Sequence, residues 1–243
     1  MFALYSKEIS SFLNSLIGYI VVTVFLVMVS LFMWVFPGEL NLIDAGYSSI
    51  ETLFVIGPWV FLFLIPAVTM RLFADEKKTG TIELLLTKPL SDLQIVLAKY
   101  LAGFTLVIFS LIPTLFYYLS VYILGNPIGN IDHGGTWGSY LGLMFLASAY
   151  VSIGIFASAI TENQIIAFII AVFLSFFFFL GFESIATLEI FRNIDSLIFQ
   201  LGINEHYKSI SRGVIDSRDI VYFLSLDALF ILLTKTLLES RKW

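Results

Sequence analysis

The chain contains no cysteine, and few of its residues carry a charge. Of its 243 residues, 59% are hydrophobic and only 13% are Asp, Glu, Lys or Arg. The absence of cysteine excludes disulfide bonds, zinc–thiolate sites and thiol nucleophiles. A soluble domain of ordinary composition carries about 25% charged residues, so this composition predicts that most of the molecular surface faces lipid. The formal net charge of −5 argues against nucleic acid as a partner, because nucleic acid needs a basic face.

The sequence also lacks a Gly-Lys dipeptide. That dipeptide belongs to the loop that holds phosphates in P-loop ATPases, so we expect this chain to bind no nucleotide of its own. The two histidines, His133 and His206, lie outside the long apolar runs and have no metal-ligand spacing. We expect them to be solvated or capping side chains, with no metal, cofactor or catalytic residue in this chain. An intramembrane hydrolase is disfavoured because it would need a base within the membrane.

Long apolar runs predict an all-α polytopic membrane protein with one transmembrane domain over residues 1–243. A helix needs about 20 apolar residues to cross the bilayer core. Six runs are close to that length: residues 17–36, 52–70, 100–124, 139–160, 163–182 and 220–238. The fourth and fifth runs are joined only by Thr161, Glu162 and Asn163, which predicts a tight helical hairpin.

Lys and Arg are distributed unevenly between the loops. The loops 37–51 and 125–138 contain none, whereas the segment 71–99 contains five, and further basic residues precede the first run and follow the last. Loops rich in Lys and Arg stay in the cytoplasm, so both termini and the segment 71–99 are expected there. The external loop 183–219 nevertheless carries four basic residues. We therefore expect it to be structured, with an amphipathic helix at the outer interface formed by Ile185, Leu188, Phe191, Ile194, Ile198 and Leu201.

The segment between the second and third spans is predicted to form a short separate helix. The second span continues into a charged stretch, and Gly80 then allows the chain to break. Glu83, three residues past Gly80, is expected to cap the helix that follows, and that helix ends before Pro89. Ser91 with Gln94 has the pattern of a capping box that opens the third span.

This short helix combines charge with leucine side chains. Its residues Ile82, Leu85 and Leu86 share one face, and Leu84, Leu85 and Leu86 provide apolar surface that no soluble core of this chain is expected to bury. Such a helix suits docking into the groove of a partner, although an interfacial loop that joins two spans would have the same pattern. The residues assigned to this docking segment are Glu76, Gly80, Thr81, Glu83, Leu84, Leu85, Leu86 and Pro89.

Residues 66–100 resemble the membrane subunit of ABC-2 type ABC transporters, above all in the run E-K-K-T-G-T-I-E-L-L-L that begins at Glu76. Within that family they look like the gliding-motility-associated permease. The resemblance continues in Lys7-Glu8, in Gly18-Tyr19-Ile20 and in residues 205–216.

The resemblance implies six transmembrane helices of the ABC-2 or type V exporter kind, an amphipathic N-terminal element and short external helices before the last span. It implies a separate ATPase subunit, which binds ATP and Mg and docks on the cytoplasmic coupling segment 71–99, and a second permease copy or related membrane subunit. The implied function is to couple ATP hydrolysis to export of a substrate, or to gliding motility or secretion, in a bacterial cytoplasmic membrane. A secondary transporter and a membrane scaffold without transport are the alternatives.

Two weaker patterns lie within the spans. Gly138, Gly142, Gly154 and Ser158 stand at multiples of four along the fourth span, and they form a stripe of small residues on which a helix can pack closely, within one subunit or against a second. Asp227 lies in the sixth span, where ionisable groups are costly and often functional. It either faces a functional cavity or forms a structural bond to a neighbouring helix.

The absence of native cysteine makes the topology directly testable. Single cysteines at positions 44, 130 and 205 are expected to react with a membrane-impermeant thiol reagent in intact cells, because the distribution of Lys and Arg places them outside. Cysteines at positions 78 and 242 should stay unreacted until the cells are permeabilised. Labelling of position 78 in intact cells would reverse the orientation.

Overall fold

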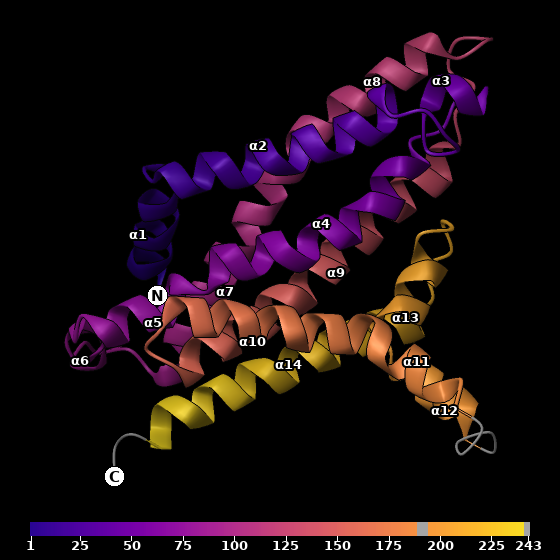
Figure 1. The fold of residues 1–243 in the computed structure, drawn as a ribbon. Coiled ribbons are helices and arrows are strands. Elements are labelled where there is room, and N and C mark those ends of the chain that lie inside the picture. The colour runs from indigo at the N-terminus through magenta and orange to yellow at the C-terminus, as the bar shows by residue number, and fades with distance from the viewer. Residues whose placement is uncertain (189–193, 241–243) are drawn as a thin grey trace.

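The computed structural model describes residues 1–188 and 194–240, and in these ranges all regular secondary structure is helical (Figure 1). Six helical segments are long and apolar enough to cross a membrane: Leu16–Val35, Glu51–Lys78, Asp92–Leu124, His133–Ile160, Gln164–Ala186 and Ser217–Glu239. The predicted all-α fold with six membrane-spanning helices is therefore confirmed.

Several spans are built from more than one helical element. The first half of the chain contains α1 (Phe2–Leu13), α2 (Leu16–Ser30), the π-helix η1 (Leu31–Val35), α3 (Leu42–Ala45), α4 (Glu51–Thr69), α5 (Arg71–Lys78), α6 (Thr81–Leu86), α7 (Asp92–Leu111), the 3-10 helix η2 (Ile112–Thr114) and α8 (Leu115–Leu124). The second half contains α9 (His133–Ile160), α10 (Gln164–Phe176), the π-helix η3 (Phe177–Gly181), α11 (Phe182–Ala186), α12 (Asp195–Phe199), α13 (Ile203–Ile210) and α14 (Ser217–Glu239).

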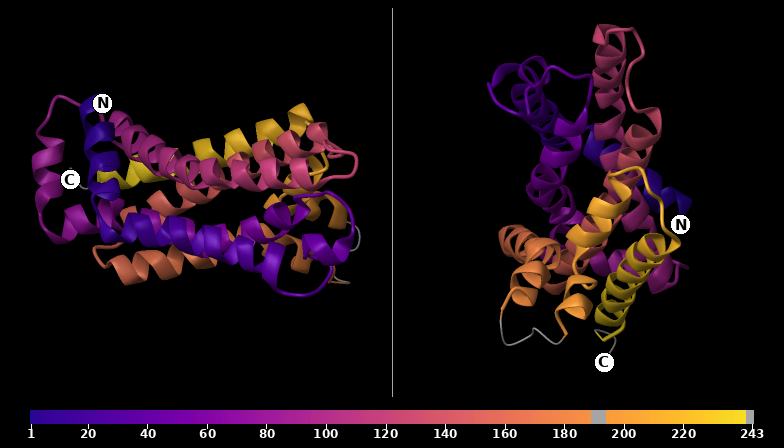
Figure 2. Two further views of the ribbon diagram at one scale, coloured as in Figure 1. Left: turned by 90° about the horizontal axis from the view of Figure 1, so that it is seen from above. Right: turned by 90° about the vertical axis from the view of Figure 1, so that its right-hand side faces the viewer.

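Helix α9 is the centre of the bundle. It contacts α4, α7, α10, α13 and α14, and the long helices run roughly side by side around it, with α1 crossing one end (Figure 2). That end also carries α5, α6 and the end of α14, whereas α3, α11, α12 and α13 lie at the other end (Figure 1). We call these the α6 end and the α13 end.

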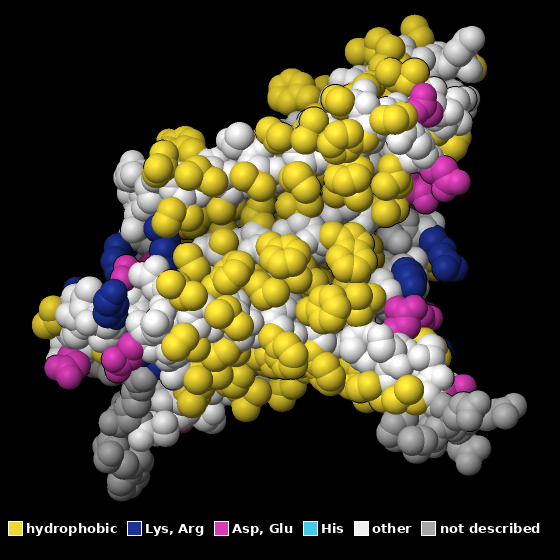
Figure 3. Space-filling model, in the orientation of Figure 1, with side chains coloured by type: hydrophobic (Ala, Val, Ile, Leu, Met, Phe, Trp, Pro, Cys, Tyr) yellow, Lys and Arg dark blue, Asp and Glu magenta, His cyan; other side chains and the backbone are white. Residues whose placement is uncertain are grey.

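Charged side chains are separated from apolar ones along the long axis of the bundle. On the face that Figure 3 shows, apolar side chains cover the middle, and Lys, Arg, Asp and Glu side chains gather towards the two ends. An apolar middle with charged ends is the arrangement that a bilayer requires, because charge is costly in hydrocarbon.

Local capping rules account for several helix boundaries. The capping box at the start of α7 is formed as predicted: the Gln94 N–H donates to Ser91 Oγ at 3.3 Å, and the Ser91 N–H donates to Gln94 Oε1 at 3.1 Å. The predicted hairpin between α9 and α10 is also present, and the Asn163 side chain accepts from the Ile165 N–H at 2.9 Å to cap α10. Both boundaries depend only on neighbours in the sequence.

The predicted amphipathic helix of the external loop is wrong in its described part. Instead of one helix, the short helices α11 and α12 stand on either side of the stretch 189–193, and Phe191 lies outside the described residues. The buried apolar face of this loop belongs to α13, where Ile203, Tyr207 and Ile210 are buried. The apolar face that is buried in this loop is the one that packs against α9. The spacing of apolar residues does not reveal which face that is.

His206 is also placed differently from the expectation of a solvated or capping side chain. Its ring is partly buried, with Nδ1 2.7 Å from Asp219 Oδ1 and Nε2 2.9 Å from the Gln200 carbonyl oxygen. The ring stacks on Tyr222 with centroids 3.9 Å apart. His206 therefore joins α13 to the start of α14.

A proline in α4 creates a second attachment of α13. Pro58 has no N–H to donate to the Phe54 carbonyl, its partner in a regular helix. The Tyr207 hydroxyl donates to that carbonyl instead, at 2.6 Å. Burial raises the pKa of Tyr207 well above its usual value, so the hydroxyl keeps the proton that it donates.

This arrangement predicts that the effects of substituting Tyr207 and Pro58 depend on each other. Tyr207→Phe should lower the stability of the chain by about 1–3 kcal/mol, because it leaves a buried carbonyl without a donor. In the Pro58→Ala background the same change should cost less, because an alanine at this position would supply the missing N–H. A double-mutant cycle on thermal unfolding in detergent measures this coupling, and additive effects would contradict it.

Candidate functional site

The second span is interrupted at Met70, where α4 passes into α5, and Ser158 of α9 forms hydrogen bonds to this junction. The Ser158 hydroxyl accepts hydrogen bonds from the N–H groups of Phe73 and Ala74, both at 3.0 Å, and donates to the Met70 carbonyl at 2.7 Å. These backbone groups lie where one helix ends and the next begins, so they lack some of their helical partners. Ser158 thus replaces bonds that the backbone loses at this interruption.

A sharp turn at Gly80 separates α5 from α6. The predicted break occurs at this residue, which has a φ of 71°, a conformation that favours glycine. The expected cap by Glu83 is not formed: the structure gives its carboxylate no capping hydrogen bond. The turn is held by Thr79, whose hydroxyl donates to the Asp75 carbonyl at 2.8 Å and lies 2.9 Å from the Thr81 hydroxyl. Glu83 stays in the first turn of α6, where a negative charge suits the helix dipole.

The leucines of α6 do not all face outward. Leu84 is 67% exposed, but Leu85 and Ile82 are buried and belong to the core cluster of the chain. The expectation that Leu85 is free for a partner is therefore wrong, because one face of α6 packs back on its own chain. The Leu86 side chain lies outside what the structure describes. The exposed residues of this helix and the turn after it are Thr81, Glu83, Leu84, Thr87, Lys88 and Pro89.

A cluster of charges joins α1, α5 and α7 beneath this turn. The Lys99 side chain has no exposed surface; its Nζ lies 2.9 Å from Glu8 Oε1 and 2.9 Å from Glu76 Oε2. The same Nζ donates to the Leu72 carbonyl at 2.6 Å. Lys7 completes the cluster, with its Nζ 2.9 Å from Glu76 Oε1 and 3.3 Å from Glu8 Oε1. We call Lys7, Glu8, Glu76 and Lys99 the Lys99 cluster.

Electrostatics within the Lys99 cluster favour the charged form of Lys7. Partial burial by itself would lower the pKa of Lys7, but the hydrogen bond from Lys7 to Glu76 and the charges of Glu8 and Glu76 raise it above its usual value. The sequence gives one indication of the cluster, since Lys99 directly precedes the apolar run 100–124. In the structure this lysine lies on the buried face of α7. Its partners could not be identified from spacing, since Glu8 is 91 residues away.

Further polar contacts fix α5 to the neighbouring helices. Lys77 donates to the Ala159 carbonyl at the end of α9, and Asp75 Oδ1 accepts from Gln164 Nε2 of α10 at 2.8 Å. Arg71 donates to Ser15 Oγ at 3.2 Å, and its guanidinium lies 4.6 Å from the centre of the Phe12 ring. Helix α5 is therefore bound to α1, α7, α9 and α10, and it cannot move without displacing their ends.

The stripe of small residues on α9 packs within one copy of the chain. Gly138 lies against the backbone of Gly213, and Gly142 faces Ile210 of α13. A Cβ on Gly154 would collide with Thr69 Oγ1 of α4. These glycines allow α4 and α13 to approach α9 closely, and Ser158 adds the hydrogen bonds of the α4–α5 junction.

Asp227 forms a bond to a neighbouring helix. Asp227 is a buried residue of α14. The hydroxyl of Tyr100, on α7, donates to its Oδ2 at 3.0 Å. Of the two alternatives for this residue, the structure shows the inter-helix bond. Within residues 1–188 and 194–240, no group of three His, Cys, Asp or Glu side chains is placed to hold a metal ion.

The comparisons with known proteins agree with this architecture. The sequence profile of a family described as ABC-2 family transporter protein matches residues 39–201, which include α4 to α6 and the central helix α9. A search of curated proteins gave no match. Because the matched residues make up most of the chain, the chain belongs to the ABC-2 transporter family.

Proposed function

We propose that this chain is the permease subunit of an ABC transporter and that a separate ATPase subunit docks on α6. Membership of the ABC-2 family supports the first part, since this family supplies the membrane-spanning subunit and not the ATPase. The position of α6 supports the second, because it lies beyond the apolar middle of the bundle and exposes Leu84 among charged and polar residues. ATP and Mg would bind to the partner subunit.

The observation that carries this proposal is the fixation of α5. A force applied to α6 passes through the turn at Gly80 into α5, which is bound to four other helices through the Lys99 cluster and its neighbouring contacts. Separating buried charges from their partners costs several kcal/mol, so α5 and these helix ends move together. In this way the segment 71–99 would couple ATP hydrolysis to movement of the spans.

The proposal also covers the membrane in which the chain lies, a second membrane subunit and the cellular role. We place the chain in a bacterial cytoplasmic membrane with both termini in the cytoplasm, which agrees with the common position of α1, α6 and the end of α14 at one end. In the spans that contain α2, α10 and α14, fewer than a third of the residues are buried, which suits lipid and a second permease copy. Export of a substrate, and a role in gliding motility or secretion, rest on the resemblance alone. A secondary transporter is less well supported, since Asp227 is engaged by Tyr100.

The docking surface predicts a specific loss of ATPase binding. Burial of a leucine side chain contributes about 1.5–3 kcal/mol, so Leu84→Asp should weaken ATPase binding about tenfold to a hundredfold. The measurement is the amount of ATPase recovered per permease in a pull-down from detergent. Leu201→Asp is the matched control, because Leu201 is 53% exposed and lies at the α13 end. Equal recovery with both variants would show that docking occurs elsewhere. Leu85 is not substituted in this experiment, because its side chain is buried and Leu85→Asp would disturb the fold.

The Lys99 cluster predicts that α1 and α5 move as one body. Spin labels at positions 14 and 78, which are both exposed, should keep one narrow distance distribution in the ATPase complex with and without ATP. Lys99→Met removes the buried cation of the cluster and leaves Glu8 and Glu76 with only the largely exposed Lys7. This loss of a buried partner is costly and should broaden that distribution.

The matched control for this experiment is Lys235→Met, because Lys235 forms only a partly exposed pair with Glu239. A distribution that stays narrow in the Lys99→Met variant would refute the transmission of force through the cluster.

A further inference from the structure

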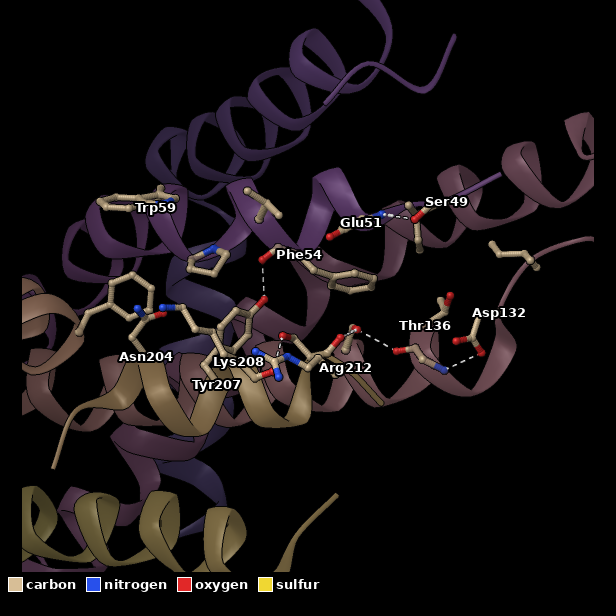
Figure 4. Close-up of a pocket in the computed structure, with 18 of the residues that line it drawn as sticks. Ser49, Glu51, Phe54, Trp59, Asp132, Thr136, Asn204, Tyr207, Lys208 and Arg212 are labelled. Carbon is tan, nitrogen blue, oxygen red and sulfur yellow. Dashed lines mark hydrogen bonds between the residues drawn. The ribbon is translucent and has the colours of Figure 1, made fainter. Parts of the chain in front are cut away.

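A cavity of about 870 Å³ lies at the α13 end of the molecule. Its walls come from α4, α9, η3 and α13, and Figure 4 shows labelled side chains of α4, α9 and α13 around it. The cavity is on the opposite end of the bundle from α6, so the proposed ATPase docking does not account for it.

One wall of the cavity is apolar and exposed on the outside of the bundle. Val55 and Trp59 line it and are 41% and 44% exposed, and the Trp59 ring meets Phe179 edge-on at 5.8 Å. Trp59 stands eight residues into α4, which begins at Glu51. At about 1.5 Å per residue, it lies roughly 12 Å deeper than the helix start. Trp59 therefore lies inside the apolar part of the second span, the part that is expected to face lipid acyl chains.

The opposite wall presents two cations from α13 and the turn after it. Lys208, near the end of α13, and Arg212, in the turn after it, both line the cavity. In the described part of the chain the exposed Arg212 guanidinium has no hydrogen bond or ion pair. The Lys208 side chain, 48% exposed, has one contact, with Nζ 3.4 Å from Glu183 Oε1. The Arg212 guanidinium is thus free to meet an anion, and Lys208 adds a second positive charge that is held only by one long, partly exposed ion pair.

Three acids also line the cavity, but only one is free. The Asp132 carboxylate caps α9 by accepting from the Gly135 N–H at 2.9 Å, and Glu183 Oε2 accepts from Asn204 Nδ2 at 2.6 Å. The Glu51 carboxylate, on α4, has no partner among the described residues. Figure 4 places Glu51 and Arg212 on different walls, so the cavity carries a free anion and a free cation apart from each other.

We propose that this cavity binds a zwitterionic phospholipid from the outer leaflet. The phosphate of the headgroup would meet Arg212 and Lys208, since guanidinium groups bind phosphate oxygens in a bidentate manner. The ammonium would meet Glu51, and an acyl chain would lie along Val55, Trp59 and Phe179. A soluble phosphate compound would leave this apolar wall uncovered, and a neutral lipid would leave the charges without partners.

Native mass spectrometry of the delipidated full chain in detergent tests the ligand class, and it needs no ATPase. The titrants are phosphatidylethanolamine, phosphatidylglycerol and diacylglycerol with the same acyl chains, and glycerophosphoethanolamine without them. Phosphatidylethanolamine should bind most tightly. Equal retention of diacylglycerol, or equally tight binding of glycerophosphoethanolamine, would overturn the proposal, because it requires both the headgroup and the tail.

Variants separate the roles of the two charges. Arg212→Met should weaken binding of phosphatidylethanolamine about tenfold to a hundredfold. Arg218→Met is the matched control, since Arg218 is also exposed but does not line the cavity, and it should leave binding unchanged. Glu51→Gln should remove the preference for phosphatidylethanolamine over phosphatidylglycerol. Equal affinity in the Arg212 and Arg218 variants would contradict the site.

Tryptophan fluorescence locates the lipid without altering the charged residues. Phosphatidylethanolamine with brominated acyl chains should quench the emission of the native chain, and Trp59→Phe should remove most of the saturable part of this quenching. If saturable quenching persists in Trp59→Phe, the acyl chain does not lie along this wall and the proposal fails.

Discussion

A lysine without exposed surface constrains the architecture of the α6 end. Lys99 lies where α1, α5 and α7 meet, and its charge is compatible with burial only while Glu8 and Glu76 remain beside it. This requirement holds the N-terminal helix across the end of the bundle and directs α5 beyond the apolar region. The position of α6, and with it the proposed docking surface, follows from the same three helices.

Side chains from neighbouring helices complete the hydrogen bonding of the second span at two of its irregular points. Tyr207 binds the carbonyl that Pro58 leaves without a donor, and Ser158 binds the backbone groups at the interruption before α5. Unsatisfied backbone groups are costly in a membrane, so the hydroxyls that α9 and α13 supply stabilise the second span at these two points. The span is therefore fixed near each end by a different helix.

Sequence rules predicted the features that depend on near neighbours. Hydropathy located the six spans, the capping box of Ser91 and Gln94 marked the start of α7, and glycine at position 80 marked the sharp turn. The burial of Leu85, the partners of Lys99 and the buried face of α13 depend on residues far away in the chain. Periodicity shows that a helix has an apolar face, but it does not tell which neighbour covers that face.

The central position of α9 has a consequence for biosynthesis. This helix has the largest buried share of the six spans, 78%, and part of its cover comes from α13 and α14, which are translated after it. When α9 leaves the ribosome, the side that will meet Ile210 and Gly213 is still bare. The bundle closes only after the last helix has been inserted, so a chain truncated before residue 203 leaves Gly138 and Gly142 of α9 uncovered.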